Sequence, residues 1–313
     1  YIFLHTYSIN HFFTNELQKK LINIAKKTNL CYNQINYKAS EEWIMIYYST
    51  PYMNYSRGFS VPDPASSIPM HSHATYELYY FISGNCEYTV EGVSNHLQPY
   101  TLLTIRANEA HRPILHDSSL YERVCIHFRP EAVDTFDPER RLLIPFDERP
   151  LGQNNLYAPH VTRESGLTDC FDTLAKSDED KYDNGIRVHT QFCRILCILS
   201  DLYKEKTATS ADVNPLVMAI VDYINRNLVQ SLSLERLCNE FYLSKSHLQR
   251  LFRDATGSTV WDYILLKRLT LAQKLLRSGC SAVAASMQSG FSEYSTFFRA
   301  YKKRFGYPPS EHI

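Results

Sequence analysis

The segment MHSHATYELYYFISG, residues 70–84, contains side chains that commonly bind transition metals. His71 and His73 alternate along it, and Glu77 follows four residues after His73. A further candidate, His111, lies in the later segment PYTLLTIRANEAHRP. Three imidazoles and one carboxylate form a ligand set that suits Fe, Mn, Ni, Zn or Cu. The residue types therefore predict a divalent transition-metal site made of His71, His73, Glu77 and His111.

These side chains lie in a region, residues 31–130, whose short runs of Tyr, Ile, Val and Phe are separated by Pro and Gly. Such runs predict β-strands, and their spacing predicts a sandwich or barrel. The segment CEYTVEGVSNHLQPYTLLTI predicts a hairpin that turns near Gly92. Side chains two residues apart share one face of a strand, so His71 and His73 are expected to point the same way. Glu77 would then converge from the next strand, and His111 from across the barrel.

Helices are expected on both sides of this region. Residues 15–28 have an amphipathic pattern, with Asn15 in the N-cap position. Residues 160–206 also have a helical pattern, and two interpretations of their apolar stripe remain open: packing onto the β-rich region, or helix pairing in a dimer. The stripe consists of Val188, Phe192, Ile195, Leu196, Leu199, Leu202 and Tyr203.

The segment LSLERLCNEFYLSKSHLQRLFRDATG, residues 232–257, predicts a helix, a tight turn and a second helix. Ser233 and Ser244 stand in N-cap positions, and Gly257 stands where the second helix would end. This arrangement is typical of helix-turn-helix DNA-binding proteins. The outer face of the second helix would offer base edges and phosphates the side chains Lys245, Ser246, His247, Gln249, Arg250 and Arg253.

The same pattern recurs in SAVAASMQSGFSEYSTFFRAYKKRFGYPP, with Ser292 as the expected cap and Gly306 as the expected end. Between the two units, TVWDYILLKRLTLAQKLLRSG predicts a helix whose apolar face includes Trp261. A helix of about 18 residues spans ~27 Å. That length approaches the ~34 Å of one duplex turn, so both units can enter successive major grooves. The second unit would present Glu293, Tyr294, Ser295, Thr296, Arg299, Lys302 and Lys303.

Residues 215–313 resemble the DNA-binding domain of the AraC/XylS family of bacterial transcription regulators. The resemblance rests on LSKSHLQRLFRDATG, on KRLTLAQKLL and on GFSEYSTFFRAYKKRFGYPPSEH. It implies double-stranded promoter DNA as a partner, an activator that works with RNA polymerase, and a cytoplasmic location in a bacterium. One departure concerns the first helix of the second unit, where the family usually has two Ile and an Ala and this chain has Ala282, Ala285 and Ser286. The smaller apolar volume predicts looser packing of this helix until DNA binds.

The segments around residues 71 and 111 resemble the two motifs of the cupin β-barrel, because residues 71–84 fit the pattern His-x-His-x3-Glu-x6-Gly. The resemblance spans about residues 31–130. In sensor domains of the AraC/XylS family it implies a barrel that binds a sugar or another small effector. The imidazoles would then be hydrogen-bonding pocket residues, with or without a metal ion. The expected effector contacts are His71, His73, Glu77, Tyr79, Glu109, His111, Arg123 and His127.

Charge is unevenly distributed along a chain whose 33 basic and 33 acidic residues balance. Residues 1–206 contain 20 basic and 25 acidic side chains, and residues 207–313 contain 13 basic and 8 acidic ones. A basic C-terminal third suits a polyanionic partner. The eight cysteines never form a Cys-x-x-Cys pair, which argues against a zinc ribbon. Since no apolar stretch reaches the ~18–20 residues of a membrane span, no membrane partner is predicted.

These patterns predict a multidomain α+β protein. Its first part would be a cupin-like β-barrel with helices, and its second an all-α domain with two helix-turn-helix units joined by a long helix. The expected divisions are residues 1–30 as an N-terminal arm and helix, 31–159 as the effector-binding barrel, 160–206 as a dimerisation or relay segment, 207–214 as a linker, and 215–313 as the DNA-binding domain.

The predicted function is a ligand-responsive, sequence-specific transcription regulator that forms a homodimer, with no enzymatic activity and no required cofactor. A carbohydrate is the effector that the resemblance suggests. Two alternatives remain open. One is a metal-dependent cupin enzyme, an isomerase or dioxygenase, with a DNA-binding tail; the other is a regulator that senses the metal itself. The enzyme is disfavoured because nothing in the sequence singles out an acid, base or nucleophile besides the metal ligands.

Overall fold

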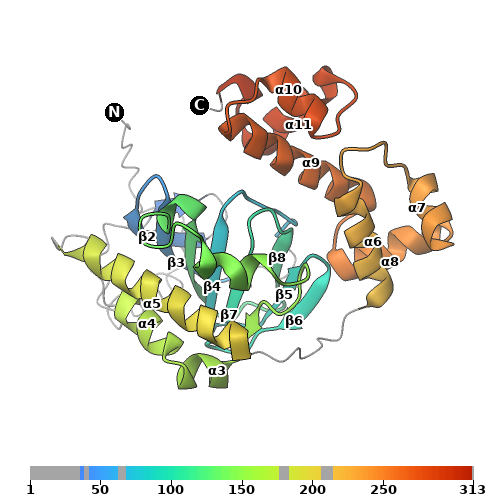
Figure 1. Cartoon of the computed structure of the whole chain (residues 1–313). Coiled ribbons are helices and arrows are strands. Elements are labelled where there is room, and N and C mark those ends of the chain that lie inside the picture. Colours follow the sequence, from blue (N-terminus) through green and yellow to red (C-terminus); the bar gives the residue numbers. More distant parts are fainter. Residues whose placement is uncertain (1–35, 39–41, 63–67, 176–182, 206–213, 312–313) are drawn as a thin grey trace, which may run out of the picture.

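The computed structural model describes residues 36–38, 42–62, 68–175, 183–205 and 214–311. Strands dominate the first half of this part of the chain, and helices make up the rest (Figure 1). The expected helix at residues 15–28, the arm at residues 1–30 and nearly all of the linker at 207–214 lie outside the described residues.

Within the described residues, ten strands build two antiparallel sheets. Seven lie in the order β1-β2-β3-β9-β4-β7-β10, and three in the order β6-β5-β8. The strands are β1 (Asn36–Lys38), β2 (Glu42–Ser49), β3 (Met53–Ser60), β4 (Tyr76–Ser83), β5 (Cys86–Val90), β6 (Val93–His96), β7 (Leu102–Ile105), β8 (His111–Leu115), β9 (Tyr121–Phe128) and β10 (Leu156–Tyr157).

The expected hairpin is confirmed as β5 and β6, joined by Glu91 and Gly92. Both turn residues have positive φ, 49° and 85°, which a two-residue hairpin of this twist requires. Gly92 adopts that conformation without steric cost, whereas Glu91 is held there by contacts described below.

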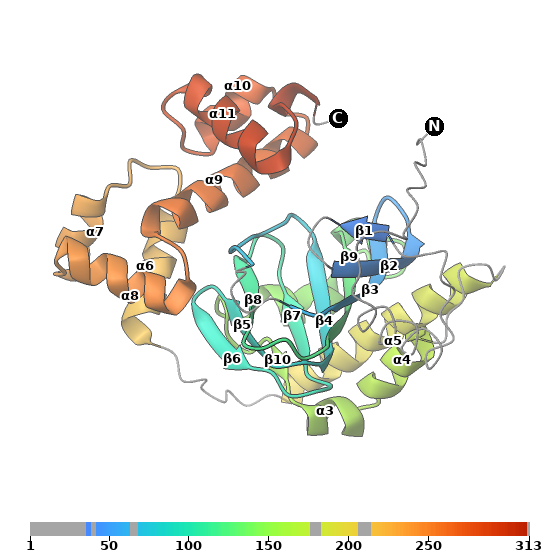
Figure 2. The same ribbon diagram turned by 180° about the vertical axis from the view of Figure 1, so that it is seen from behind.

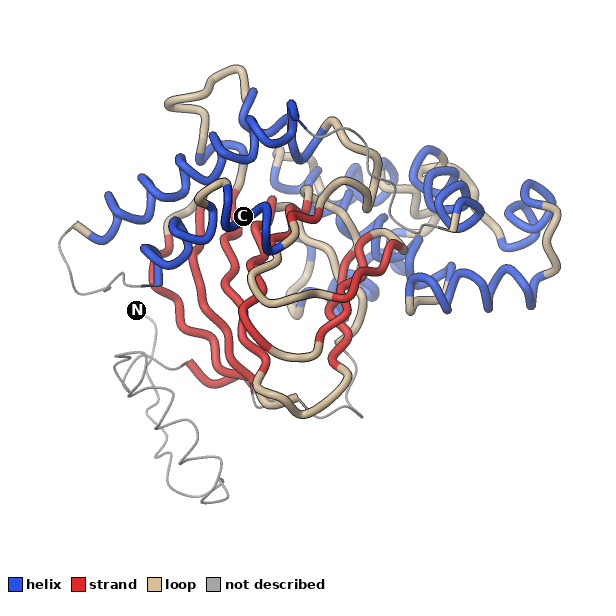
Figure 3. The backbone as a smooth tube through the Cα atoms, turned by 90° about the horizontal axis from the view of Figure 1, so that it is seen from below, coloured by secondary structure: helices blue, strands red, loops and turns tan. Residues whose placement is uncertain are grey.

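The two sheets enclose one core. Buried side chains of the larger sheet, such as Tyr79 and Leu103, share a cluster with Tyr88 and Val90 of the smaller sheet. Because side chains alternate along a strand, Leu78 and Tyr80 of β4 point to the opposite face. That outer face is covered by α3 (Pro159–Glu164), α4 (Leu167–Ala175) and α5 (Asn184–Glu205), which lie along one side of the strands in Figure 3.

The apolar stripe of α5 packs onto this outer face. Phe192 lies edge-on to Phe128 of β9, and Tyr80 of β4 stacks on Phe171 of α4 at 4.1 Å between ring centroids. Five members of the predicted stripe are fully buried, so packing accounts for them. Between β9 and β10 the chain forms the short helices η2 (Pro130–Ala132), η3 (Arg141–Leu143) and α2 (Ile144–Asp147).

The remaining elements are all helical. Figure 2 shows α9 running between two helix pairs that lie at its opposite ends. We call α7 with α8 the first helix pair, and α10 with α11 the second helix pair. The helices are α6 (Pro215–Arg226), α7 (Leu234–Phe241), α8 (Lys245–Thr256), α9 (Val260–Arg277), α10 (Ala282–Gln288), α11 (Tyr294–Phe305) and η4 (Pro309–Glu311).

Most of the expected helix ends are confirmed. The side chains of Ser233 and Ser244 accept hydrogen bonds at the starts of α7 and α8, and Gly257 and Gly306 end α8 and α11 in left-handed conformation. One cap is wrong: α11 begins after Glu293, whose side chain makes no capping hydrogen bond, so Ser292 lies one residue outside the helix.

The apolar face of α9 also differs from the expectation at one position. Trp261 is 58% exposed, whereas Val260 and Tyr263 are buried. The core-facing stripe is therefore rotated away from Trp261 near the start of the helix. Among the described residues, no helix is both long and apolar enough to cross a membrane.

Candidate functional site

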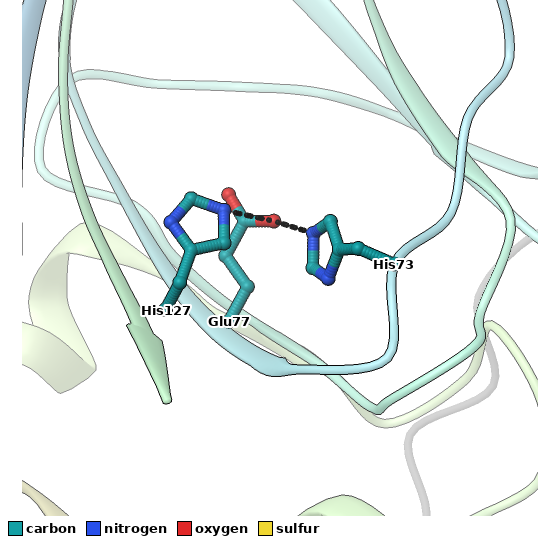
Figure 4. Close-up of side chains that lie close together, drawn as sticks. All are labelled: His73, Glu77 and His127. Carbon is teal, nitrogen blue, oxygen red and sulfur yellow. Dashed lines mark hydrogen bonds and ion pairs between the residues drawn. The ribbon is translucent and has the colours of Figure 1, made fainter. Parts of the chain in front are cut away.

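Glu77 of β4 lies at the centre of an imidazole cluster inside the barrel (Figure 4). Pairing of β4 with β9 places Glu77 opposite His127. Measured to Glu77 Oε2, the Nε2 atom of His73 is 2.9 Å away, and those of His111 and His127 are each 3.4 Å away. Three nitrogen atoms from three separate segments thus converge on one carboxylate oxygen.

The second ring nitrogen of two of these histidines faces a backbone carbonyl oxygen. His73 Nδ1 lies 2.9 Å from the oxygen of Thr75, and His111 Nδ1 lies 2.8 Å from the oxygen of Glu109. A carbonyl oxygen only accepts hydrogen bonds, so each Nδ1 carries the proton and donates it. In the neutral form of such a ring the Nε2 lone pair can act as a metal ligand, as in metal-bound histidines with an outer carbonyl partner.

His71 lies at the edge of the cluster. Its ring centroid is 4.4 Å from that of His111 and 6.5 Å from that of His73, and its Nδ1 lies 3.1 Å from the oxygen of Pro69. An isolated bridge joins its backbone to that of His111. His71 and His73 therefore precede β4 in an irregular segment, where the sequence had suggested a regular strand.

Burial and charge oppose each other at this site. Burial alone would raise the pKa of Glu77, but the charge of His127 and hydrogen bonds from the histidines hold it well below 4.5. Burial alone would lower the pKa of His127, but the Glu77 carboxylate outweighs it and raises this pKa above 6.5. Burial lowers the pKa of His73, and burial together with His111 lowers the pKa of His71 to about 3.

The donor set fits a divalent transition metal. Each contact between an Nε2 atom and the Glu77 carboxylate is attractive when a proton or a metal cation lies between the two atoms, so a bound metal ion would take the place of those protons. Ligand atoms ~2.0–2.2 Å from one ion are themselves about 3.0–3.4 Å apart, close to the separations seen around Glu77. The buried Nε2 of His111 has no hydrogen-bond partner among the described residues. A proton on Nε2 of His127 would make its contact with Glu77 Oε2, one of the three, attractive.

The predicted metal set is reproduced only in His73 and Glu77, and the compact group of ligand atoms found among the described residues does not include His71 or His111. Among the described residues, ligand atoms of His73, Glu77 and His127 all lie within 4.8 Å of one another. His127 stood among the expected effector contacts but outside the expected metal ligands. Its signal was the alternation of Arg123, Cys125 and His127 along β9, which becomes informative only once β9 is known to pair with β4.

Two further expected effector contacts share the inner face of the barrel with Glu77. Tyr79 follows Glu77 by two residues, is 2% exposed, and hydrogen-bonds through its hydroxyl to the hydroxyl of Tyr121. The guanidinium of Arg123 lies 5.1 Å from the centre of the Tyr121 ring. Tyr79 and Arg123 therefore belong to the polar wall of the barrel next to the cluster.

Glu109 lies elsewhere. Its carboxylate is fully buried and accepts hydrogen bonds from Arg149 at 2.6 and 2.8 Å and from the backbone of Arg106 at 2.9 Å. Burial would raise its pKa, but the charge of Arg149 outweighs burial and lowers it. Both oxygens are thus engaged in the barrel structure, and only the backbone carbonyl of Glu109 touches the cluster, through His111.

A second candidate site is the outer surface of α8 and α11. Leu248 and Phe252 of α8, and Phe297 and Tyr301 of α11, face the interior and are fully buried. All thirteen side chains expected to contact DNA are exposed: Lys245, Ser246, His247, Gln249, Arg250 and Arg253 on α8, and Glu293, Tyr294, Ser295, Thr296, Arg299, Lys302 and Lys303 at the start and along the face of α11.

Comparison with known proteins matches both halves of the chain. The family model described as AraC-like ligand binding domain matches residues 54–177, and the one described as helix-turn-helix domain matches residues 237–313. The multiple antibiotic resistance protein MarA of Escherichia coli (strain K12) is 35% identical over 97 residues, 31% of this chain and 76% of MarA.

Longer similarity is found to the HTH-type transcriptional activator RhaR of Mannheimia succiniciproducens, which is 22% identical over 259 residues, 78% of this chain and 86% of RhaR. The structure of ToxT from Vibrio cholerae is 13% identical and covers 83% of this chain and 97% of that one, with a TM-score of 0.37. That score is too low to carry an argument.

The matched domains and relatives are those of a transcriptional regulator rather than of an enzyme. The β-rich half contains the ligand-binding domain, and the helical half contains the DNA-binding domain. The chain belongs to the AraC family of transcription regulators.

Proposed function

We propose that this regulator binds a small effector at the Glu77 cluster and binds a specific promoter through α8 and α11. The observation that supports this proposal is a polar cluster around the buried Glu77 in the ligand-binding domain, together with exposed polar faces on α8 and α11 of the same chain. The buried imidazole of His111 and the buried carboxylate of Glu77 are costly to retain unless they are hydrogen-bonded or bind a ligand.

The parts of the chain take the following roles in this proposal. Residues 31–159 form the effector domain, residues 160–206 pair two copies in a dimer or relay the signal, and residues 207–214 link them to the DNA-binding domain at 215–313. The protein acts in the bacterial cytoplasm as an activator that contacts RNA polymerase. The activator role is supported by the similarity to RhaR, a transcriptional activator.

The DNA-binding role is tested with duplexes selected from a random pool by the purified protein. Lys245→Ala and Arg250→Ala should weaken binding to the selected duplex, because each removes an exposed donor of α8. Lys302→Ala should reduce the log–log salt slope by about one, as expected for one lost phosphate contact. Unchanged affinity and an unchanged slope in all three variants would remove α8 and α11 from the DNA interface.

Two effector classes suit the cluster. A carbohydrate matches the family resemblance, and the neutral rings of His71 and His73 offer it hydrogen-bonding atoms. A divalent transition metal is favoured by one specific observation, the convergence of three Nε2 atoms on Glu77 Oε2. In that case Glu77, His73, His111 and His127 hold the ion, His71 lies beside it, and the chain is a metal-sensing regulator.

Metal analysis of protein purified without a metal-affinity column separates these classes. Near one equivalent of a transition metal per chain, lost in the His73→Ala/His127→Ala double variant, is the result expected for a metal sensor. A metal-free protein that also fails to take up added Zn²⁺ or Co²⁺ would reject the metal, and calorimetric titration with sugars would follow. The His96→Ala variant is a matched control, because His96 lies on β6, outside the cluster.

A further inference from the structure

Helix α9 is attached to the barrel by polar contacts along one of its faces. Glu91, in the turn between β5 and β6, accepts hydrogen bonds from the hydroxyl of Tyr263 and from Lys267 Nζ, the latter at 2.8 Å. Lys267 Nζ also donates to the oxygen of Asn108 at 2.7 Å. One turn further along, the hydroxyl of Thr270 lies 2.7 Å from that of Ser72.

Glu91, Tyr263 and Lys267 form what we call the Glu91 latch. Glu91 and Tyr263 are fully buried, and Lys267 is 8% exposed. Glu91 also accepts the backbone N–H of Ala110 at 2.8 Å, so both carboxylate oxygens are engaged. A buried ion pair whose hydrogen-bonding groups are satisfied in this way depends on the two domains staying together, because separating them exposes or orphans each partner.

Apolar packing accompanies the latch. Met70 and Ala110 of the barrel belong to the same buried cluster as Phe252 of α8 and Tyr263 of α9. The first helix pair and α9 therefore rest on the barrel through a continuous apolar and polar surface. The recognition residues of α8 and α11 remain exposed in this arrangement. Docking thus sets the orientation of the DNA-binding domain without covering it.

Two barrel groups of this interface are sequence neighbours of a cluster histidine. Ser72 lies between His71 and His73, and Ala110 precedes His111. The backbone also links the two sites, since the N–H of Asn108 donates to the oxygen of His73 at 2.8 Å. Neighbouring residues of an extended chain point to opposite sides. The same backbone therefore presents an imidazole to the barrel interior and an interface group to α9.

We propose that filling of the Glu77 cluster and docking of α9 onto the barrel are thermodynamically coupled through Ser72, Asn108, Ala110 and the Glu91 latch. This inference rests on the proposed effector site, and it states how binding at that site would affect the docking of the DNA-binding domain. Coupling is positive, because the arrangement in which the Nε2 atoms converge is also the one in which the latch is closed. A ligand that holds His73 and His111 in place then holds residues 108–111 in the conformation that Glu91 and Lys267 bind.

Positive coupling is reciprocal in affinity. Breaking the latch must therefore weaken binding at the cluster, although no latch residue contacts the ligand. Conversely, disturbing the cluster must loosen α9. Among the described residues, no cluster side chain makes a hydrogen bond or an ion pair with α9. A purely structural latch has neither effect, since it would change the stability of the interface alone.

The test uses the full chain, with Co²⁺ as the probe and amide hydrogen exchange of α9 and of residues 107–111 as the readout. Lys267→Met opens the latch with little change in volume. Lys274→Met is its matched control, the same change two turns further along α9, where the lysine side chain is exposed. Glu77→Gln disturbs the cluster, and His127→Gln repeats that disturbance with a residue at the rim in case Glu77→Gln does not fold.

In the wild type, Co²⁺ should slow exchange in both segments. Lys267→Met should speed exchange in α9 and weaken Co²⁺ binding by a factor within the roughly 5–150-fold range of allosteric couplings, while Lys274→Met leaves both unchanged. Equal Co²⁺ affinity in wild type and Lys267→Met, with α9 loosened in the latter, would overturn the coupling and leave the metal site intact.

Failure of the proposed metal site gives a different result. If wild-type protein does not bind Co²⁺, the metal-sensing function is rejected. The coupling is then tested by comparing amide exchange in α9 between the metal-free wild type and the metal-free cluster variants. Faster exchange in α9 of Glu77→Gln or His127→Gln than in the wild type then supports coupling to a different effector. Unchanged exchange in α9 of both folded variants overturns it.

Discussion

The two helix pairs share a sequence pattern but differ in what they pack against. The buried cluster of the first pair, which includes Leu237 and Phe252, extends into the barrel through Met70 and Ala110. Within the described residues, the buried cluster of the second pair, which includes Phe297, comes only from α9 and the segments after it. The first helix pair therefore packs against the barrel, and the second lies at the far end of α9.

Their local construction differs as well. Both helices of the first pair are capped by serine side chains, whereas the N-cap residue of α11, Glu293, makes no side-chain capping hydrogen bond. The first helix of the second pair, α10, has seven residues, and its buried positions are the small residues Ala285 and Ser286. Aromatic side chains of α11 and of the turn before it, among them Phe291 and Phe297, supply most of the core volume instead. The same helix-pair sequence pattern is thus compatible with different sets of buried side chains.

The largest expected effect compares two equivalent core residues, Phe252 of α8 and Phe297 of α11, both fully buried. Phe252→Ala and Phe297→Ala should each lower the free energy of unfolding of the helical domain by about 3–5 kcal/mol, through lost burial and a cavity. Urea denaturation measures this cost.

The two variants should differ in their effect on the barrel. Phe252→Ala should also speed amide exchange at Ala110 and in the β5–β6 turn, because Phe252 shares a cluster with Ala110. Phe297→Ala should leave those amides unchanged. Equal effects of the two variants on the barrel would show that the second helix pair is attached to it as firmly as the first.

A smaller effect is expected from pH, and it should appear in the barrel. The folded-state pKa of His71 is about 3 and that of His73 is lowered, whereas both titrate near 6.5 in an unfolded chain. Below pH 6.5 the unfolded state therefore binds more protons at these two groups, and stability falls as pH falls. His127 has the opposite dependence, but only above pH 6.5, because the stability from its raised pKa is fully present below pH 6.5 and is lost as pH rises through its folded value.

Because His127 is protonated in both states well below pH 6.5, His71 and His73 alone set the slope there, at up to two net protons, or at most ~2.7 kcal/mol per pH unit, down to about pH 4.5. Urea midpoints of metal-free protein at pH 6.5 and 5.5 measure it. His71→Asn should flatten the dependence by removing one of the two groups. Below pH 4.5 the Glu77 contribution also begins to fade, because its lowered pKa stabilises the fold only while the carboxylate is ionised. A barrel midpoint that rises on acidification would contradict this balance.

The smallest expected effect concerns the helix caps. Ser244→Ala should cost about 1 kcal/mol, because the Ser244 hydroxyl satisfies a backbone N–H at the start of α8. Glu293→Ser should stabilise the second pair by up to about the same amount, because it supplies the cap that α11 lacks. Thermal unfolding measures both changes. If Glu293→Ser gives no gain, the backbone before α11 does not present residue 293 in capping geometry.

Features that depend on local chemistry could be predicted from the sequence. The serine caps at 233 and 244, the glycine ends at 257 and 306, and the hairpin at Gly92 each depend on a few adjacent residues. The exposed faces of α8 and α11 follow from helical periodicity, which places Leu248 and Phe297 inside and the long polar side chains outside. The neighbouring positions of His73, Glu77 and His111 followed from the cupin-like motif.

The remaining features depend on which strands and helices become neighbours. His127 joins Glu77 because β9 pairs with β4, and Glu109 leaves the site because Arg149, forty residues later, takes its carboxylate. Glu91 and Lys267 meet across 176 positions of the chain. The sequence around a charged residue does not reveal whether its side chain stays in water or pairs with a buried partner. Only the tertiary structure decides which occurs, since desolvation is compensated by a partner that local sequence does not specify.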